Sequence, residues 1–528
     1  MSRIKRPNGQ HWWLIGTALA LTVFLTTCWS RGADLVVDGG DTYAVSNDVT
    51  FNNIYVGNLS TGNLNQSGFT NTLTGNLYLG YSAGSSGAYN LSGGSLSASN
   101  EVIGLTGSGV FTQSNGDNTM IGNLQLGYDP GGSGTYNLSG GSLSTGVEFI
   151  GFSGQGVFNQ SGGTASVNSY TYLGFSPGSS GVYNLSGGSL SQVRQYVGLY
   201  GSGIFNQTGG SNTVQLIDIY SGLYLGYWGD ARGAYNLSNG SLTAPFEIVG
   251  VFGTGVFNQS NGVNKINGDL SLGDGRNSSG TYNLSGGDLS VENEVIGASG
   301  NGTFIQTGGT HTITGDLVLA ASPGSRGTLA LLGGGISVGG NYIQTAAGTL
   351  AVGLSSSANF PKIEVGGTAS LNGAFIPVLQ GGYLPLGNQL FHGVISAAQG
   401  ISGTFGTMGN QFITPTLYWQ PLYTPNTFDL LVLRSYTNPA LTLTRNQSNV
   451  GAILNSVATS AAGDLNTALN AIDGLSSSSL VANAFQQISP DKATALPALA
   501  LAGANLQMRN LSRRVTNLRF GGSEMDSA

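Results

Sequence analysis

The stretch that decides the fold is residues 158–188, FNQSGGTASVNSYTYLGFSPGSSGVYNLSGG, in which one short phrase occurs twice. The phrase that begins at Phe158 resembles the phrase that begins at Tyr183, 25 residues later. Each consists of an aromatic residue, Asn, a variable residue, Ser and two glycines. A strand fragment that is bounded by Gly and Ser is typical of a short β-strand ending in a turn.

These phrases continue through the centre of the chain in a single register. Tyr-Asn-Leu-Ser recurs with steps of 47, 47, 52 and 47, beginning at Tyr89, Tyr136, Tyr183, Tyr235 and Tyr282. Phe-Asn-Gln-Ser or a variant recurs with the same steps, beginning at Phe111, Phe158, Phe205, Phe257 and Phe304. Degenerate copies at Leu64 and Leu329 lie 47 residues beyond the ends. Two phrases with one spacing indicate a repeat architecture.

Each 47-residue unit divides into two similar halves. Leu77-Tyr78-Leu79-Gly80 resembles Glu101-Val102-Ile103-Gly104, 24 residues later, so the structural period is 22 to 25 residues. A six-bladed propeller would fit the 47-residue step, but a four-stranded blade has no place for the half-repeat. One rung of a parallel β-helix needs about this many residues for three strands and three turns.

We therefore predict an all-β fold, a right-handed parallel β-helix of about twelve rungs. At roughly 4.8 Å between adjacent strands, these rungs form a rod of roughly 60 Å. We expect a signal peptide at 1–33, the repeats at 34–340, a β-rich cap at 341–437 and a short helical segment at 438–528.

The low charge content agrees with a stacked fold. Asp, Glu, Lys and Arg make up 8% of the chain, against about 25% in typical soluble domains. Like charges in adjacent rungs, about 4.8 Å apart, repel by about 0.9 kcal/mol even in water. Amide and hydroxyl side chains can instead hydrogen-bond along the stack. We expect such a ladder at Asn90, Asn137, Asn159, Asn184 and Asn206.

The charge balance argues against a nucleic-acid partner. Residues 34–433 contain six basic and nineteen acidic residues, a formal charge of −13. Binding to a duplex requires clustered Lys and Arg, and this segment has no such cluster.

The aromatic residues of the two phrases form a column with two interpretations. Facing inward, they would be a core stack, in which aromatic pairs add about 0.5–1.5 kcal/mol beyond area burial. Facing outward, they would form a stripe that stacks on the sugar rings of a host or matrix glycan. The neighbouring column mixes Leu and Gln and leaves both interpretations open. We favour the core, and the alternative binding stripe consists of Tyr89, Phe111, Tyr136, Phe158, Tyr183, Phe205, Tyr235 and Phe257.

Acidic residues also recur at one repeat position, at Glu101, Glu148, Glu247 and Glu294, with Gln195 in the third unit. Neighbours two rungs apart are separated by about 9.6 Å. Two of them are then too far apart to ligate one calcium ion at about 2.3–2.6 Å or to act as a retaining glycosidase pair at about 5–5.5 Å. We interpret them as a solvated column.

Residues for catalysis are sparse. The histidines are His11, His311 and His392, and no Cys or carboxylate lies near them at metal-ligand spacing. A β-helix polysaccharide lyase needs clustered Asp, Arg and Lys, which the sequence lacks. We predict no catalytic residue, metal site or cofactor. The third unit carries five extra residues within Ser211–Gly222, which we expect to form a loop that is either merely tolerated or binds a partner.

The N-terminus predicts export through the inner membrane. A basic start precedes an apolar run from Trp12 to Thr27, and small residues follow near Gly32 and Ala33. This is the pattern of a signal peptide with its cleavage site. The run is shorter than the roughly 20 residues of a membrane-spanning helix, so we expect cleavage rather than anchoring. Cleavage would also remove Cys28, the single cysteine.

The C-terminal third resembles a known family. The segments at 342–352, Ser402–Phe405 and Phe428–Leu433 look like the end of an autotransporter passenger. The order of AFQQISPD at 484–491, ALP at 495–497 and the segment Leu511–Arg514 is similar to the linker before the translocator barrel of that family. The resemblance implies that 341–437 caps the β-helix and that a helix of the linker threads the pore of an outer-membrane barrel.

The sequence departs from this family after Phe520. Eight residues cannot hold a barrel of about twelve strands of about 10 residues each. We expect that the barrel has been lost or is encoded separately, or that the sequence is a fragment. The resemblance predicts a non-catalytic structural or adhesive passenger, secreted or on the surface of a Gram-negative-type bacterium. The alternatives are a carbohydrate- or matrix-binding module and, third, a polysaccharide lyase.

Overall fold

The computed structural model describes residues 3–4, 32–489 and 495–520. The chain forms two compact units. The first contains Met1–Gly381, Gly393–Gly409 and Tyr423–Phe428, and the second contains Gly382–His392, Asn410–Leu422 and Asp429–Ala528. Most of the predicted signal peptide lies outside the described residues.

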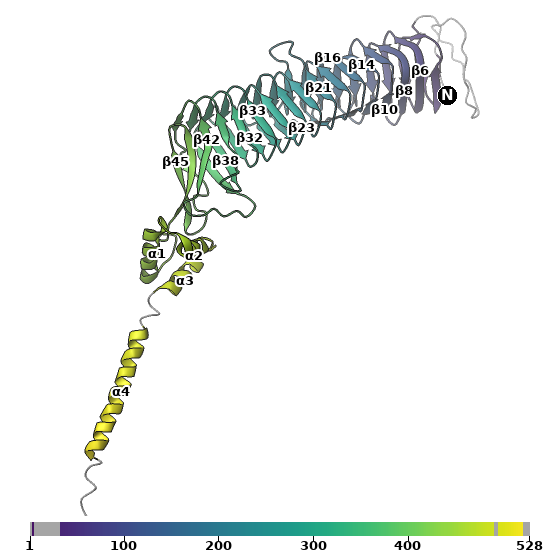
Figure 1. Ribbon diagram of the computed structural model, residues 1–528. Helices are drawn as coiled ribbons and strands as arrows, with labels where there is room; N and C mark the ends of the chain where they lie inside the picture. Colours follow the sequence, from purple (N-terminus) through teal and green to yellow (C-terminus); the bar gives the residue numbers. More distant parts are fainter. Residues whose placement is uncertain (1–2, 5–31, 490–494, 521–528) are drawn as a thin grey trace, which may run out of the picture. The chain divides into compact units, whose positions relative to one another are not determined.

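The first unit is a parallel β-solenoid of about 14 turns over residues 41–379 (Figure 1). The strands pair in register, so that Phe158 lies opposite Tyr136 on one side and Tyr183 on the other. The predicted parallel β-helix is confirmed, and its right-handedness stays a prediction. The solenoid has more turns than the twelve expected from the phrases because pairing continues without them, with Leu350 opposite both Leu329 and Phe375.

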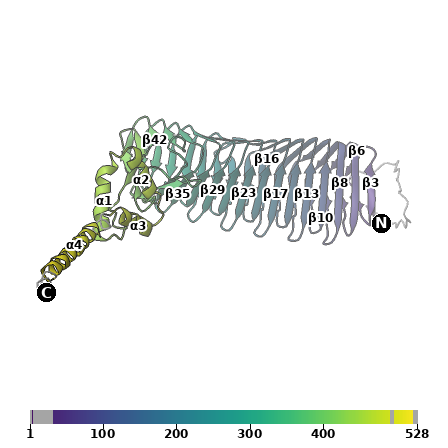
Figure 2. The same ribbon diagram turned by 60° about the horizontal axis from the view of Figure 1, so that its bottom comes forward.

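The strands join three parallel stacks, whose regular spacing is also visible in Figure 2. Four long strands contribute residues to two stacks: β6 (Thr61–Leu73), β8 (Ser86–Ala98), β14 (Ser142–Ile150) and β16 (Thr164–Leu173). The first stack carries the aromatic phrases and consists of β3 (Asp41–Val45), β6 (Thr61–Leu73), β8 (Ser86–Ala98), β10 (Ser108–Gln113), β13 (Ser133–Leu138), β15 (Gln155–Gln160), β17 (Ser180–Leu185), β20 (Ser202–Gln207), β23 (Arg232–Leu237), β26 (Thr254–Gln259), β29 (Ser279–Leu284), β32 (Asn301–Gln306), β35 (Arg326–Leu331), β38 (Gly348–Leu354), β41 (Ala374–Leu379) and β44 (Thr407–Met408).

The second stack follows the Gly-Gly turns, and its last members β42 and β46 contribute residues to both units. Besides parts of β6 and β8, it consists of β4 (Val49–Phe51), β11 (Asp117–Met120), β14 (Ser142–Ile150), β16 (Thr164–Leu173), β18 (Ser189–Gln192), β21 (Ser211–Val214), β24 (Ser241–Ala244), β27 (Val263–Ile266), β30 (Asp288–Val291), β33 (Thr310–Ile313), β36 (Ile336–Val338), β39 (Ile363–Val365), β42 (Leu390–Ala397) and β46 (Thr427–Arg434).

The third stack closes each turn and begins with an antiparallel pair, β1 with β2. Besides parts of β14 and β16, it consists of β1 (Arg3–Ile4), β2 (Leu35–Val37), β5 (Ile54–Val56), β7 (Asn76–Leu79), β9 (Asn100–Ile103), β12 (Asn123–Leu126), β19 (Arg194–Val197), β22 (Gly222–Leu225), β25 (Glu247–Val249), β28 (Asp269–Leu272), β31 (Asn293–Ile296), β34 (Leu317–Leu319), β37 (Tyr342–Gln344), β40 (Ala369–Leu371) and β43 (Ile401–Gly403).

A glycine ends most strands of the third stack, and Gly104 shows why. Its φ is +72°, in the left-handed region, and a Cβ on it would lie 2.0 Å from the carbonyl oxygen of Ser133. Only glycine fits both the backbone angle and this close approach. The high glycine content therefore follows from the corners of the solenoid.

The predicted asparagine ladder is present on the outside of the first stack. The side-chain amide of Asn159 donates to the side-chain oxygen of Asn137 at 2.8 Å, and that of Asn184 donates to Asn159 at 2.8 Å. The same bond recurs for Asn90, Asn206, Asn236, Asn258 and Asn283. Each link satisfies a donor of one rung with an acceptor of the next.

The second unit contains the predicted C-terminal helices. They are α1 (Arg445–Ala458), α2 (Gly463–Asp473), α3 (Ser478–Ile488) and α4 (Ala495–Phe520), and the strand β45 (Leu417–Tyr423) lies largely in this unit. Thr444 and Gln447 form a capping box at the start of α1, which satisfies two backbone donors. No helix in the described ranges combines the length and the hydropathy of a membrane-spanning segment.

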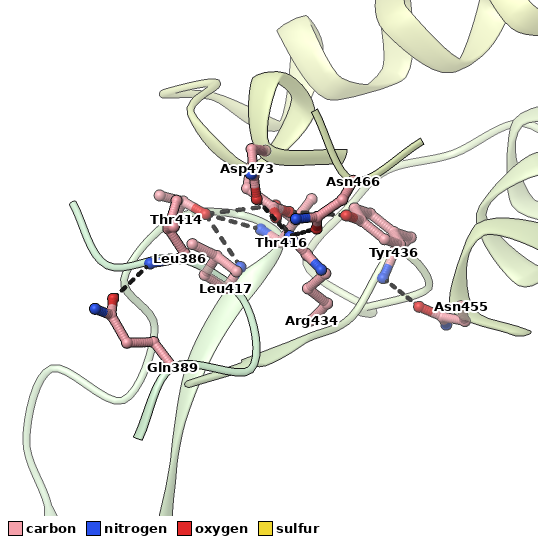
Figure 3. Close-up of polar contacts among 11 residues, drawn as sticks. Leu386, Gln389, Thr414, Thr416, Leu417, Arg434, Tyr436, Asn455, Asn466 and Asp473 are labelled. Atoms are coloured by element: carbon pink, nitrogen blue, oxygen red, sulfur yellow. Dashed lines mark hydrogen bonds and ion pairs between the residues drawn. The ribbon is translucent and has the colours of Figure 1, made fainter. Parts of the chain in front are cut away.

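A buried polar cluster joins the strands and helices of this second unit (Figure 3). The carboxylate of Asp473, at the end of α2, accepts hydrogen bonds from Thr416 at 2.9 Å, Arg434 at 2.7 Å and Tyr436 at 3.0 Å. Arg434 also donates to Asn466 and Asn470. Because each charge has several partners, the cluster can remain buried. Its groups are occupied by one another, so we interpret it as holding the strands and helices of this unit together rather than as a binding site.

Candidate functional site

The ten-ring column of the repeat phrases lies inside the solenoid. Every ring from Tyr89 to Phe304 is 0% exposed, and successive ring centroids are 4.6–5.0 Å apart. The core interpretation is confirmed. The alternative binding stripe is wrong, because no ring among its members reaches solvent: Tyr89, Phe111, Tyr136, Phe158, Tyr183, Phe205, Tyr235 and Phe257.

Polar side chains line the solenoid interior beside this column. The hydroxyl of Tyr136 donates to the side-chain oxygen of Gln113 at 2.5 Å, and the amide of Gln113 donates to the carbonyl of Ser142 at 2.8 Å. Asn118 donates to the hydroxyl of Tyr136 at 3.0 Å and to Glu101 at 3.2 Å. The mixed Leu and Gln column therefore faces inward, since the tyrosine hydroxyls supply partners for the glutamines.

The recurring acidic residues belong to this interior, and the prediction of a solvated column is wrong. Glu101, Glu148, Glu247 and Glu294 are all 0% exposed. Glu101 pairs in register with Leu77 and Leu124, which also face inward. Burial raises the pKa of Glu101, Glu148 and Glu247 to about 8, because desolvation disfavours the charged carboxylate.

His311 modifies the interior near the end of the repeats. It lies 47 residues after Asn264, whose side-chain amide donates to the buried Glu247. His311 thus occupies the equivalent position beside Glu294. Its Nε2 atom is 2.8 Å from the carboxylate of Glu294, and both side chains are 0% exposed. Its ring also stacks on Phe304, with centroids 4.7 Å apart. Sequence spacing missed this pair, whose burial makes it part of the core. Across the described ranges, no three His, Cys, Asp or Glu residues gather as metal ligands.

A second set of aromatic residues covers the outside of the solenoid, and sequence reasoning missed it. We call it the lateral aromatic face. It lies on strands of the third stack and on the turns that follow them. Its members are Phe149, Phe152, Tyr170, Tyr172, Phe175, Tyr196, Tyr200, Tyr224, Tyr227, Trp228 and Phe252. Its central rings stack like those of the core, since Tyr196 lies 5.1 Å from Tyr172 and 5.0 Å from Tyr224.

The accessible part of this face is its edge beyond the strands. Tyr196 and Tyr224, at the centre, are 9% exposed, whereas Tyr200, Trp228 and Phe252 are 46%, 41% and 45% exposed. Trp228 stacks between the other two rings, with centroids 6.2 Å from Tyr200 and 5.1 Å from Phe252. These three residues, the exposed aromatic edge, form an apolar surface of adjacent rungs that solvent and partners can reach.

The extra residues of the third unit form the expected loop at the opposite end of β22. We call residues 215–221 the insertion loop; Figure 1 shows a loop projecting from the solenoid close to β21. Four large apolar side chains in it are 62–79% exposed: Leu216, Ile217, Ile219 and Tyr220. Such exposure is unusual for a merely tolerated insertion, because loop tips are normally polar.

Arg194 connects the insertion loop to the lateral aromatic face. Its guanidinium forms an ion pair with Asp218 at 2.6 Å and lies 5.1 Å and 5.5 Å from the ring centroids of Tyr170 and Tyr220. The hydroxyl of Tyr224 also donates to the backbone carbonyl of Tyr220 at 2.7 Å. The hydrogen bond from Arg194 lowers the pKa of Asp218, so the ion pair stays charged and the loop keeps its place on the face.

A polar groove lies further along the solenoid, beside β33, β36 and β39. It has a volume of about 610 Å³ and is lined by residues that include Thr312, Ser337, Lys362 and Glu364. The rest of its lining mixes glycine and small polar residues with apolar ones such as Leu332, Ile336 and Phe360. The groove offers scattered hydrogen-bonding groups without a nucleophile and base in contact, so it is a weaker candidate than the lateral aromatic face.

No known protein family matches the chain, and no curated protein is significantly similar to it.

Proposed function

We propose that this chain is the non-catalytic passenger of an autotransporter-like protein, a rod that is displayed outside the cell and adheres through its lateral aromatic face. The observation that carries the proposal is the exposed aromatic edge together with the insertion loop. Much of the rest of the solenoid surface presents Asn, Ser, Thr and Gly, with exposed apolar side chains such as Leu59 and Ile121 on separate turns. A contiguous apolar patch on such a surface marks an interaction site.

The proposed export route draws on both ends of the chain. The signal-peptide pattern, with its cleavage site near Gly32 and Ala33, would direct export of the chain through the inner membrane. Helix α4 has 26 residues, a length of about 39 Å, and its side chains from 499 to 519 are all exposed. A long helix whose side chains are exposed throughout 499–519 supports this route, in which it threads a translocator barrel that belongs to a longer form of the chain or is encoded separately.

A second candidate function is carbohydrate binding, which the exposed aromatic edge favours. Trp228 lies between Tyr200 and Phe252 in adjacent rungs, so the three rings form a row along the solenoid. Rows of aromatic rings offer apolar contact with limited loss of side-chain entropy. A host or matrix glycan would then lie along the exposed aromatic edge, not along the buried column from Tyr89 to Phe257.

Adhesion and display are tested separately. We expect a variant with Tyr200, Trp228 and Phe252 all changed to Ala to lose adhesion to glycan arrays or matrix-coated plates by roughly tenfold or more, the cost of losing interface anchors. Its matched control changes Leu59 and Ile121, exposed apolar residues elsewhere on the solenoid. Full adhesion by the triple variant would overturn the adhesive role of the edge.

Display is measured by protease treatment of intact cells that produce the chain with a translocator barrel. We expect the solenoid to be digested or released while periplasmic markers stay intact. Retention inside the cell under these conditions would overturn the proposed export route.

A further inference from the structure

We propose that the insertion loop docks the solenoid onto the interfacial region of a lipid bilayer, with zwitterionic rather than anionic lipids as its preferred surface. This inference deepens the proposed adhesive role, because it names a class of surface that the rod contacts.

The shape and composition of the loop are those of an insertion element. Leu216, Ile217 and Ile219 are 68%, 66% and 79% exposed on one short projecting loop. Interfacial segments bury their apolar side chains about 5–10 Å deep at the boundary of headgroups and acyl chains. Three exposed aliphatic side chains within four residues of a projecting loop, with Asp218 between Ile217 and Ile219, offer apolar groups for this depth.

Internal hydrogen bonds also lower the cost of bringing the polar backbone of the loop toward an apolar medium, where unsatisfied groups are expensive. The hydroxyl of Ser221 accepts hydrogen bonds from the amides of Ile217 at 3.1 Å and Asp218 at 3.0 Å. The carboxylate of Asp218 accepts from the amide of Tyr220 at 2.9 Å, and the amide of Ser221 donates to the carbonyl of Asp218 at 3.1 Å. Four donors of the loop thus have internal partners.

The charge of the loop is neutralised within the protein. Asp218 is the single charged residue of segment 215–221, and its carboxylate pairs with Arg194 at 2.6 Å. Behind the aliphatic tip lie Tyr220 and Tyr224, joined by a hydrogen bond, and then Tyr227 and Trp228. Aliphatic residues at the tip with Tyr and Trp behind them repeat the arrangement of an aromatic belt at a membrane interface.

The distribution of apolar surface favours a bilayer over a protein partner. A stable protein interface takes about 800 Å² and about 20–30 residues from each side. Here the centre of the lateral aromatic face is already covered, with Tyr196 and Tyr224 at 9% exposed. The open apolar surface beside it consists of a seven-residue loop and the exposed aromatic edge.

The charge of the solenoid determines the lipid preference. Residues 34–433 carry a formal charge of −13, and an anionic leaflet repels acidic segments. The loop itself offers no basic cluster that would compensate. Binding should therefore be strongest on neutral phosphatidylcholine vesicles, where it should be insensitive to added salt. It should weaken with added phosphatidylserine, and salt should partly restore it there by screening the repulsion.

Vesicle flotation of the purified full chain tests the proposal. The loop variant is Leu216→Ser with Ile219→Ser, and the matched control is Leu59→Ser with Ile121→Ser, whose residues are 73% and 90% exposed on other turns. We expect the vesicle partition coefficient of the loop variant to fall by roughly tenfold or more, because two aliphatic side chains no longer enter the bilayer. The control should bind like the wild type. Circular dichroism checks that each variant keeps its strands.

Three outcomes would overturn the proposal. One is a wild-type chain that does not float with phosphatidylcholine vesicles. Another is a loop variant that floats as well as its control. The third is concentration-dependent self-association that the loop substitutions abolish, which would assign the loop to a second copy of the chain. Vesicle binding uses purified protein, so it can fail while glycan adhesion and cell-surface display succeed, and the reverse also holds.

Discussion

The inner aromatic column and the lateral aromatic face have the same chemistry and opposite surroundings. Ring centroids are 4.6 Å apart between Phe158 and Tyr183 inside, and 5.1 Å apart between Tyr172 and Tyr196 outside. The inner column has a ring in every turn from Tyr89 to Phe304, whereas the outer row is interrupted by residues such as Gln125. Strict repetition therefore marks packing, and interrupted repetition marks a surface whose side chains packing leaves free to vary.

Among substitutions in the two aromatic regions, truncating one inner ring is expected to change the free energy of unfolding most. Phe158→Ala should lower the free energy of unfolding by about 3–5 kcal/mol, because it leaves a cavity between two stacked tyrosines. The measurement is the denaturant or thermal unfolding midpoint, with loosening detected first in the adjacent turns. An unchanged midpoint would contradict the core assignment that the buried rings establish.

The buried glutamates should give the solenoid an unusual dependence on pH. Their folded pKa is about 8, above the ordinary value of 4.5 in the unfolded chain. Their contribution to stability is then fully present below about pH 4.5 and is lost as pH rises toward 8. Each such carboxyl should lower the free energy of unfolding by about 1.4 kcal/mol per pH unit in this window.

Glu148→Gln tests this dependence, because glutamine keeps the shape without the titration. We expect the slope of unfolding free energy against pH to become shallower by about 1.4 kcal/mol per unit. Glu292→Gln is the control, since Glu292 is exposed on the outside of the solenoid. Equal slopes for the wild type and Glu148→Gln would show that Glu148 is already ionised in the folded state.

The sequence predicted the parallel solenoid because the stacking that builds it also imposes the strict repeat. The direction of the glutamates was readable as well: the comparison of Leu77-Tyr78-Leu79-Gly80 with Glu101-Val102-Ile103-Gly104 places Glu101 on an inward leucine position. The rule that carboxylates face solvent outweighed this alignment. The rule fails for Glu101 because burial raises the pKa of its carboxyl, which can then be neutral, and because Asn118 supplies a hydrogen bond.

The lateral aromatic face was harder to predict. Tyr172, Tyr196 and Tyr224 recur in only part of the repeat, and spacing alone does not show that the rungs bring them together. The insertion was located correctly within Ser211–Gly222, and its Leu-Ile-Asp-Ile-Tyr sequence was a signal that a merely tolerated loop would not give. Its contacts with Arg194 depend on three-dimensional register and could not be derived from spacing.

A smaller effect is expected on the outer side of the same strands that hold the inner rings. Asn159→Asp and Asn184→Asp place two carboxylates on neighbouring rungs, next in sequence to Phe158 and Tyr183. About 0.9 kcal/mol of repulsion follows at about 4.8 Å in water, measured as the coupling energy of a double-mutant cycle in unfolding experiments. A coupling near zero would contradict the view that stacking repulsion explains the low charge content.

The smallest effect on stability is expected at the exposed aromatic edge. Trp228→Ala should change the free energy of unfolding by no more than about 0.5 kcal/mol, because truncating a solvent-facing ring leaves no closed cavity. Its stacking partners Tyr200 and Phe252 are themselves 46% and 45% exposed and can relax into solvent. Trp228→Ala should weaken adhesion while leaving stability nearly unchanged. Phe158→Ala should do the reverse, because it lowers stability without altering the outer surface. Unfolding midpoints and adhesion, measured on one preparation of each variant, make the comparison direct. A loss of several kcal/mol in Trp228→Ala would place the edge among the packing residues, and interrupted repetition would then no longer distinguish the binding surface from the core.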